Sequence, residues 1–418
     1  MLAAPALTRR FRTAAWLLAA GFLAASCAAP DASAPQAADR SWHDVRAQAQ
    51  GATVRLWMWG GDPQGNAYVD EVLAPAALDR LGVILERVPV ADTTDALNRV
   101  LAERQAGRED GDVDLVWVNG DNFRTGLQAG AWLCGWSDRL PNMTYTDPDD
   151  PLLASDFGTP VDGCEAPWSK AQFTLVYDAA RVADPPTTLP GVLEWAEQHP
   201  GRFTYPAPPD FTGSVFVREV LTSLAGGASQ VPAAFDQDAY DRLAPDLYRR
   251  LNELAPSLWR QGATYPRDST ALDRLFAEGE VDMTMTYGPA TLTGLVEQGT
   301  FPATTRVLRL VDGTVGNASF LAIPSTSPNR SAAMAVANLA LSPEQQAVKA
   351  DPAVWGQFTV LDATRLPARG RAAFAELPRS PVVPPFEVLS RNAHGELGAG
   401  WVGALDEGWR RDVLGAGS

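Results

Sequence analysis

The chain has 418 residues, with 34 basic and 50 acidic side chains and a formal net charge of −16 at pH 7. This length exceeds the usual size of a single hydrophobic core, so two lobes are expected. The negative field repels phosphate groups and argues against nucleic acid as a partner.

The N-terminus has the features of an export signal. Three arginines precede the apolar stretch 14–25, which is too short to span a bilayer, and small residues follow it. The sequence Ala-Ala-Ser-Cys that ends at Cys27 resembles a bacterial lipobox, although the leucine stands four residues before the cysteine instead of three. We therefore expect residues 1–27 to be a lipoprotein signal peptide and Cys27 to carry a lipid that anchors the protein outside the cytoplasm. An ordinary cleaved signal is the alternative.

A flexible tether is expected over residues 28–50. Its first part, 28–40, is a polar tract with too little apolar content to fold, and it would hold the folded part off a membrane surface. Removal of the signal leaves 31 basic and 50 acidic residues, a net charge of −19.

Two further cysteines, Cys134 and Cys164, remain in the exported chain. An even pair in an oxidising compartment predicts a disulfide, which would add about 3 to 4 kcal/mol in the chain-entropy model. Two buried free thiols are the alternative.

The first half of the folded part alternates between strands and helices, the pattern of a parallel sheet. Gly107 is the expected stop of the second helix, and Asp121 the expected cap of the third. The expected elements are a strand at 53–59, a helix at 69–81, a strand at 83–90, a helix capped by Asp92 or Thr93, a strand at 113–118 and a helix toward Leu127.

In open α/β sheets, ligands bind beyond the carboxyl ends of the strands. These ends correspond to Trp59-Gly60-Gly61 and to Asn119-Gly120, so both loops are expected to face one cleft. Turn geometry alone also explains the glycines, and neither loop carries a phosphate-binding motif.

The second half continues the alternation. A stiff loop with three prolines, 205–214, leads into a helix that Asp210 or Thr212 would cap, and such a helix start can hold an anion or a polar ligand group. A plain helix cap explains the same residues. The expected elements are extended segments at 172–177 and 203–205, helices at 192–198 and 212–224, strands at 282–286 and 319–323, a helix at 332–341 and a further helix capped by Ser342.

Three segments together resemble the YnjB-like family of solute-binding proteins of ABC importers: 117–123 (WVNGDNF), 165–172 (EAPWSKAQ) and 200–213 (PGRFTYPAPPDFTG). Segments 279–289 and 325–329 resemble the second-lobe strand and the return crossing of maltose-type binding proteins. The resemblance implies an α/β, two-lobed type II periplasmic-binding fold, in which each lobe is a mainly parallel sheet flanked by helices. It also implies a monomer that closes on a small ligand and then engages the permease and ATPase of an importer.

The same resemblance suggests a division of the chain. Lobe 1 would comprise 51–172 and 316–345, lobe 2 would comprise 173–315, and 346–418 would be a C-terminal helical segment packed on the lobes.

The family includes carriers of thiamine, polyamines, iron and sugars, so the ligand residues are predicted from their chemistry. Stacking surfaces, hydrogen-bonding groups, one acid for a cation and two close-approach glycines are expected, while core packing is the more frequent role of any single tryptophan. The stacking candidates are Trp59, Trp168 and Tyr287, and the hydrogen-bonding candidates are Asn119, Asn122, Gln172 and Thr212. The acid is Asp210, and the two glycines are Gly60 and Gly213. No cofactor or metal is expected, because the three histidines lack metal-ligand spacing.

Two other functions are considered. A secreted hydrolase could use Asp162 and Glu165 as its acid and base, although no nucleophile elbow is present. A surface protein-binding module would use the aromatic loops without any small ligand. Lys170 is interpreted as a solvated strand residue.

Overall fold

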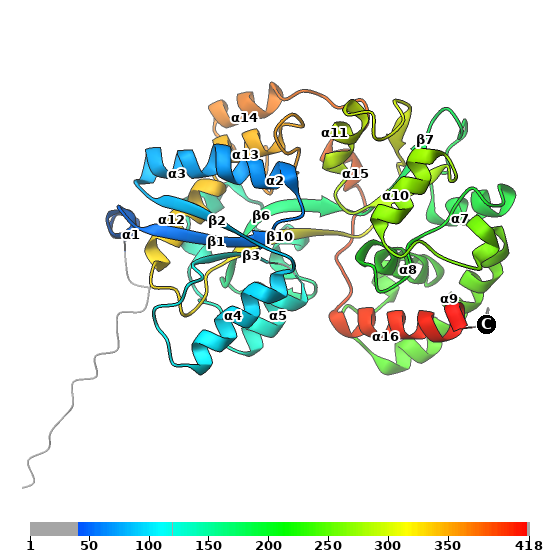
Figure 1. Cartoon of the computed structure of the whole chain (residues 1–418), viewed down its shortest axis with the longest axis horizontal. Coiled ribbons are helices and arrows are strands. Elements are labelled where there is room, and N and C mark those ends of the chain that lie inside the picture. The colour runs from blue at the N-terminus through cyan, green and yellow to red at the C-terminus, as the bar shows by residue number, and fades with distance from the viewer. Residues whose placement is uncertain (1–40, 119, 416–418) are drawn as a thin grey trace, which may run out of the picture. The chain divides into compact units, whose positions relative to one another are not determined.

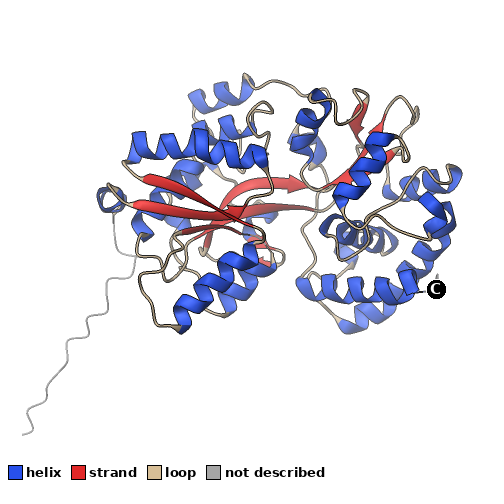
Figure 2. Cartoon of the chain, viewed as in Figure 1, coloured by secondary structure: helices blue, strands red, loops and turns tan. Residues whose placement is uncertain are grey.

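The structure is a computed structural model that describes residues 41–118 and 120–415. Two sheets organise this part of the chain (Figures 1 and 2). We call the five-stranded sheet with its covering helices lobe 1, and the three-stranded sheet with its helices lobe 2. The signal peptide with Cys27, and the tether region 28–40, lie outside the described residues.

The sheet of lobe 1 is mixed. β1 pairs in parallel with β2 and β3, whereas β10 is antiparallel to both β3 and β6. Its strands, in spatial order, are β2 (Ile84–Val90), β1 (Thr53–Trp59), β3 (Leu115–Val118), β10 (Gly316–Ala322) and β6 (Glu165–Gln172).

Helices cover both faces of this sheet (Figure 1). One face packs on α2 (Pro63–Ala67), the π-helical η2 (Tyr68–Leu73), α3 (Ala74–Leu81), α12 (Arg330–Ala340) and α13 (Pro343–Ala350), and α14 (Ala368–Ala375) lies beside α13. The other face packs on α4 (Thr93–Gln105) and α5 (Asp121–Gln128). The alternating side chains of β1 and β10 supply both cores, as a sheet buried on two faces requires.

The expected tether is too long. Residues Trp42–Ala49 form a helix, α1, capped by Ser41 and packed on α12. Only Val45 and Ala49 are buried on it, so its apolar stripe is too thin to stand out in a polar sequence.

The sheet of lobe 2 differs from the expected mainly parallel arrangement. β7 (Thr174–Asp178) is central, and β8 (Met283–Thr286) and β9 (Thr305–Val307) both pair with it antiparallel. The segment 203–205, which the alternation predicts as an extended neighbour, is buried but belongs to no strand of the described chain. Isolated backbone hydrogen bonds, and no strand ladder, reach this segment and the residue before it. Trp259 N donates to Phe203 O at 2.8 Å, and Asp282 N donates to Arg202 O at 2.8 Å.

Helix α8 is the centre of lobe 2, and every residue from Thr212 to Thr222 is buried. The C-terminal α16 packs on α8 and α9, where Trp409 Nε1 donates to the Tyr205 hydroxyl at 3.0 Å. The helices are α7 (Leu189–Gln198), α8 (Phe211–Leu224), α9 (Gln237–Leu254), α10 (Ser269–Glu278), α11 (Leu292–Glu297), α15 (Phe386–Leu389) and α16 (Ala399–Trp409).

Short elements complete the chain. A hairpin of β4 (Ser155–Asp156) and β5 (Thr159–Pro160) follows α6 (Pro151–Ala154). The remaining turns are η3 (Ser137–Arg139), η4 (Pro141–Tyr145), η5 (Ala228–Gln230), η6 (Ala255–Ser257), η7 (Trp259–Gly262), η8 (Pro289–Thr291) and η9 (Arg410–Leu414). A disulfide joins Cys134 to Cys164. Among the described residues, no helix has both the length and the apolar character needed to cross a membrane.

Candidate ligand-binding site

Two neighbouring strands of lobe 1 carry the chain toward lobe 2 and back (Figure 2). Where they cross, Gln172 Nε2 donates to Thr314 O at 2.7 Å and to Thr314 Oγ1 at 2.6 Å, and Thr314 Oγ1 donates to Phe173 O at 2.6 Å. Val315 N donates to Glu219 Oε1 at 2.6 Å, which ties the crossing to α8. Gln172, a predicted ligand residue, therefore holds the hinge region together through its amide nitrogen.

The carboxyl ends of β1 and β3 lie at one edge of the sheet. Gly60 N donates to Val90 O at 2.9 Å, and a Cβ on Gly60 would lie 2.9 Å from Pro89 Cβ, so the glycine allows this close approach. Trp59 is exposed, with 46% of its surface accessible. Asn119 lies outside the described residues. Asn122 Oδ1 accepts from Thr94 Oγ1 of α4 at 3.0 Å, at the surface of lobe 1.

Trp168 belongs to the core of lobe 1, against the expectation that it offers an accessible stacking surface. It is fully buried, and its ring centroid lies 5.4 Å from that of Trp117, 5.3 Å from that of Trp355 and 6.5 Å from that of Tyr68. Lys349 is buried beneath it and donates to Trp168 O, and this burial lowers the pKa of the ammonium group well below its usual range. Trp168 therefore supports the site from within lobe 1.

Lys170 is not a solvated strand residue. Its Nζ lies 2.5 Å from Asp150 Oδ2, with only 12% of the side chain accessible. The ion pair fixes β6 against the segment that leads into the β4–β5 hairpin.

The start of α8 has less free hydrogen-bonding capacity than its sequence suggests. Asp210 is the N-cap: its Oδ1 accepts from Gly213 N at 2.9 Å, and its Oδ2 accepts from Ser269 N at 3.1 Å. Both oxygens therefore accept from backbone amides at the starts of helices and are not left to bind a cation. Thr212 is buried within the same turn. A Cβ on Gly213 would lie 2.1 Å from Pro206 O, so the glycine is required for packing against the proline-rich loop.

An aromatic bridge connects the two lobes next to this helix start. The ring of Phe157, in the β4–β5 turn of lobe 1, lies 6.3 Å from that of Phe211 at the start of α8. Phe211 in turn lies 5.1 Å from Tyr287, edge to face. The next residue of the turn, Gly158, is close enough to Gly398 of the chain before α16 that a Cβ on it would lie 3.9 Å from Gly398 Cα. Tyr287, a predicted ligand residue, therefore lies at the interface between the lobes.

Buried carboxylates gather around this bridge. Arg218 donates to Glu396 Oε2 from Nη2 at 3.1 Å and from Nε at 3.2 Å, and His394 Nε2 lies 3.6 Å from Glu219 Oε1. The acids are at least nine-tenths buried, and we call them the interlobe acidic cluster: Asp156 and Glu165 of lobe 1, and Glu219 and Glu396 from the chain that packs with lobe 2.

The environment of the cluster disfavours the charged carboxylates. Burial raises the pKa of Asp156 to about 7; the Gly120 amide, which donates to both of its oxygens at 2.7 Å, acts in the opposite direction, and the Glu396 charge adds to the rise. Burial and the neighbouring Asp156 raise the pKa of Glu165 well above its usual range. Burial alone would lower the pKa of His394, but the Glu219 carboxylate beside it raises that pKa above its ordinary value.

Several polar atoms of this region have no hydrogen-bond partner among the described residues. They include both carboxylate oxygens of Glu165, Glu396 Oε1 and the Tyr287 hydroxyl. Buried polar atoms are normally paired, and an unpaired carboxylate is costly. The arrangement therefore places buried carboxyl groups, a tyrosine hydroxyl and aromatic rings together at the interface between the lobes.

The described residues do not form the two other kinds of site considered, a metal site and a hydrolase site. No group of three or more His, Cys, Asp or Glu side chains in the described ranges is placed to hold a metal ion. Asp162 is exposed, whereas Glu165 is fully buried, so this predicted hydrolase pair does not share one solvent-accessible site.

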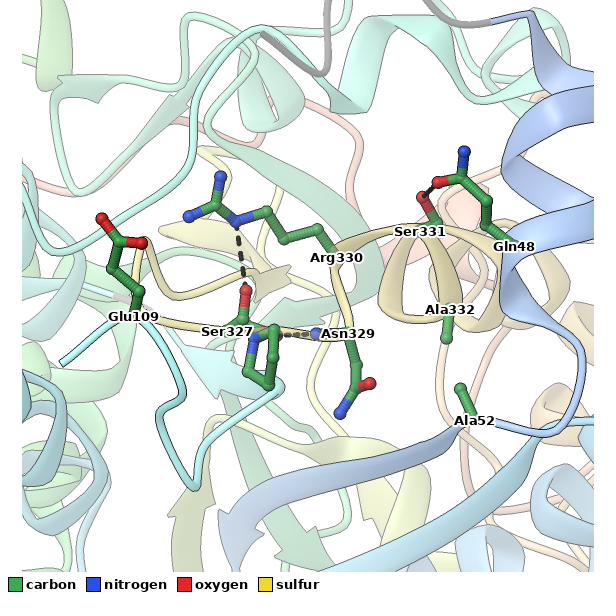
Figure 3. Close-up of a pocket in the computed structure, with 9 residues that line it drawn as sticks. Gln48, Ala52, Glu109, Ser327, Asn329, Arg330, Ser331 and Ala332 are labelled. Carbon is green, nitrogen blue, oxygen red and sulfur yellow. Dashed lines mark hydrogen bonds between the residues drawn. The ribbon is translucent and has the colours of Figure 1, made fainter. Parts of the chain in front are cut away.

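A separate polar pocket of about 330 Å³ lies elsewhere on lobe 1 (Figure 3). It includes Ala52, just before β1, and the residues that begin α12, with Arg330 Nε donating to Ser327 O at 3.1 Å. Because β1 starts here, the pocket lies at the amino ends of the parallel strands, opposite the end at which ligands bind in such sheets.

Phe157, Phe211, Asp156 and Glu396 were not predicted. Phe211 follows directly after Asp210 in a segment that the sequence does single out, and its position just inside a helix start was the available signal. The short hairpin at 155–160 and the loop at 390–398 show no periodic pattern, so their side chains gave no local signal.

Two α/β lobes joined by crossing strands form the type II periplasmic-binding fold. Residues 71–369 match the family model of the bacterial extracellular solute-binding proteins. The chain is 37% identical to protein YnjB of Escherichia coli strain K12 over 370 residues. This alignment covers 88% of this chain and 92% of YnjB. The chain belongs to the bacterial extracellular solute-binding proteins.

Solved structures share the fold at low sequence identity. An ABC transporter protein from Clostridium perfringens ATCC 13124 superimposes with a TM-score of 0.62 at 15% identity, covering 86% of this chain and 99% of that one. The spermidine/putrescine ABC transporter substrate-binding protein PotD from Streptococcus pneumoniae, in complex with calcium and HEPES, superimposes with a TM-score of 0.62 at 13% identity, covering 86% and 98%.

Proposed function

We propose that this protein is the solute-capturing subunit of an ABC importer, which binds a small polar solute between its two lobes and delivers it to the permease. The observation that carries the proposal is the set of buried polar groups at the interface, where the Tyr287 hydroxyl faces the Glu396 carboxyl and both oxygens of Glu165 have no hydrogen-bond partner among the described residues. Family membership and the two-lobed fold support it. The protein would act by binding alone, without chemical turnover.

Glycines lie where the lobes approach one another. A Cβ on Gly294 of α11 would lie 3.2 Å from Gln64 Nε2 of α2, and one on Gly356 would lie 3.0 Å from Ala290 O. Backbones without side chains can approach closely and separate again, which suits a hinge motion between an open and a closed form. The permease would select the closed, liganded form.

Lobe closure gives a direct test. Small-angle scattering of the processed protein is compared before and after addition of the small-molecule fraction of its host. We expect the radius of gyration to fall, and the Gly294→Leu variant, whose side chain is wedged against α2, to resist this change. An unchanged radius together with an unchanged melting temperature would contradict solute capture. Retention of a partner protein instead would favour the surface-interaction function.

The membrane anchor is a separate part of the proposal. We infer that signal cleavage exposes Cys27 as the lipidated N-terminus and that the protein is held as a monomer at the outer face of the bacterial membrane or in the periplasm. Metabolic labelling with a fatty acid should mark the wild-type protein and not Cys27→Ser. Equal labelling of the two would place the anchor elsewhere, and no labelling of either would favour an ordinary cleaved signal.

A further inference from the structure

We propose that Phe157 is an interlobe latch: its ring, at the tip of the β4–β5 hairpin of lobe 1, packs on Phe211 of lobe 2 when the lobes close and so stabilises the closed form. This inference rests on the proposed function and adds a residue that determines how readily the lobes close on a solute. Its basis is a bulky side chain held in an unfavourable backbone conformation at a point where the two lobes touch.

The tip of this hairpin has only two residues. Asp156 pairs with Thr159, so Phe157 and Gly158 form the loop, and their φ angles are 45° and 75°. Positive φ at both positions is the feature of a type I′ turn, for which Asn-Gly is a favoured sequence. A phenylalanine at the first position is unfavourable, because its Cβ crowds the backbone at positive φ. Local turn chemistry therefore favours asparagine and gives no reason for the aromatic ring.

The base of the hairpin is fixed to lobe 1. Gly120 N donates to both carboxyl oxygens of Asp156 at 2.7 Å, and Val161 N donates to Ala154 O at 3.2 Å. A Cβ on Gly120 would lie 3.4 Å from Phe157 Cδ2, so the ring rests against this glycine. The hairpin thus gives the Phe157 ring a defined position on lobe 1.

The ring meets the other lobe and not a core. Neither Phe157 nor Phe211 belongs to a hydrophobic core cluster of the described residues. Phe157 is half-buried and Phe211 is 46% exposed, and their ring centroids lie 6.3 Å apart at an interplanar angle of 49°. Aromatic pairs at such separations attract each other beyond the apolar area that they bury. The contact therefore stabilises the approach of the lobes and contributes little to the folding of either one.

The partner ring is also held in place. Phe211 is the first residue of α8, directly after the N-cap Asp210, and its ring lies 5.1 Å from that of Tyr287, edge to face. Tyr287 belongs to the core of lobe 2. Because each ring is fixed on its own lobe, opening the lobes separates the rings without unfolding either lobe. The unfavourable turn remains in the open form, while the contact that offsets it is present only in the closed form.

Single-molecule energy transfer between the lobes tests the latch. Dyes are attached to Asp79→Cys on α3 and Asp238→Cys on α9, two exposed positions on different lobes, and the native cysteines of the folded part are bonded to each other. Each variant is measured at the amount of the small-molecule fraction of the host that closes half of the wild-type molecules. We expect the ratio of closed to open molecules to fall by about 3- to 10-fold in Phe157→Asn and in Phe211→Ala, and to be retained in Phe157→Tyr.

Two further measurements distinguish a latch from a residue that only supports the fold. Phe157→Asn combined with Phe211→Ala should lower the ratio no further than either change alone, because both remove the same contact. The melting temperature of unliganded Phe157→Asn should equal or exceed that of the wild type, since asparagine suits the turn. The matched control is Phe235→Ala, which removes a partly exposed ring that packs on Trp401 within lobe 2 at 5.4 Å and should leave the ratio unchanged.

The outcomes separate this inference from the function on which it rests. An unchanged ratio in Phe157→Asn, or losses that add in the double variant, would overturn the latch while leaving solute capture intact. A lower melting temperature of unliganded Phe157→Asn would assign the ring to folding and would also overturn it. Failure of the proposed function appears differently, as a wild-type protein in which the host fraction does not change the distance between the dyes, and this result would remove the basis of both.

Discussion

Replacement of Asp156 by asparagine should alter the pH dependence of stability in a defined direction. The Asp156 carboxyl is buried, accepts from the Gly120 amide and lies near two further acids, Glu165 and Glu396. Burial raises its pKa from 3.8 to about 7, and the Glu396 charge adds to this shift. Asparagine keeps an acceptor oxygen for the amide and removes the titration.

The sign follows from proton binding. Between pH 4 and 7 the folded protein holds a proton on Asp156 that the unfolded chain has released, so the free energy of unfolding falls as pH rises through this range. Below pH 4 both states hold the proton and the effect vanishes. A pKa raised from 3.8 to about 7 lowers the free energy of unfolding above pH 7 by about 4 kcal/mol, because each pKa unit corresponds to ~1.4 kcal/mol. Glu165 acts in the same direction, so the variant retains part of the slope.

Urea unfolding at pH 5 and pH 8.5 measures this difference. Relative to the wild type, Asp156→Asn should gain stability mainly at pH 8.5, by up to about 4 kcal/mol. The control Glu109→Gln should shift stability by the same small amount at both pH values, because that carboxylate is exposed. An Asp156→Asn variant that loses more stability at pH 8.5 than at pH 5 would show that the carboxylate is charged and favourably solvated, and would refute the reasoning.

Three further predictions concern closure and packing. Gly294→Leu should weaken solute binding without lowering the melting temperature of the unliganded protein, since leucine is the better helix former and the wedge opposes only closure; equal affinity in calorimetry would contradict this. Trp168→Ala should cost about 3 to 5 kcal/mol in urea unfolding, whereas Trp59→Ala, at an exposed ring, should cost less than about 1 kcal/mol, and similar losses would refute the core assignment of the former. Replacing Cys134 and Cys164 by serine should lower stability by about 3 to 4 kcal/mol for a loop with a sequence separation of 30, and identical melting of the oxidised protein and the variant would refute it.

Local signals predicted most of lobe 1. The strand expected at 53–59 is β1 (Thr53–Trp59), and the helix expected after Asp92 begins at that cap, with Asp95 completing a capping box. Such features depend on a few neighbouring residues and need no tertiary context. Asp121 was expected to be a cap but is the first residue of α5, and Gly120 is the N-cap.

Features that depend on distant partners were harder to predict. The antiparallel sheet of lobe 2 is set by which strands meet, and strand alternation along the chain does not reveal that. Helix α1 was hidden because two buried residues, Val45 and Ala49, suffice to seat it on α12.

In the candidate site, too, residues with a local sequence signal were predicted and residues that meet only in the folded chain were not. Tyr287 was predicted from its place at a strand end and lies at the interface, whereas Asp210 and Gln172 turn out to support helix starts and the crossing. Asp156 and Glu396 are separated by 240 positions in the sequence and meet only in the folded chain, so no local spacing marks them as a pair.

The central claim is that a small solute is held between the lobes, and native mass spectrometry of the processed protein isolated from its own host tests it most directly. We predict a mass equal to the chain plus one small molecule, which is released on denaturation. The mass of the chain alone, unchanged after incubation with the small-molecule fraction of the host, would contradict solute capture.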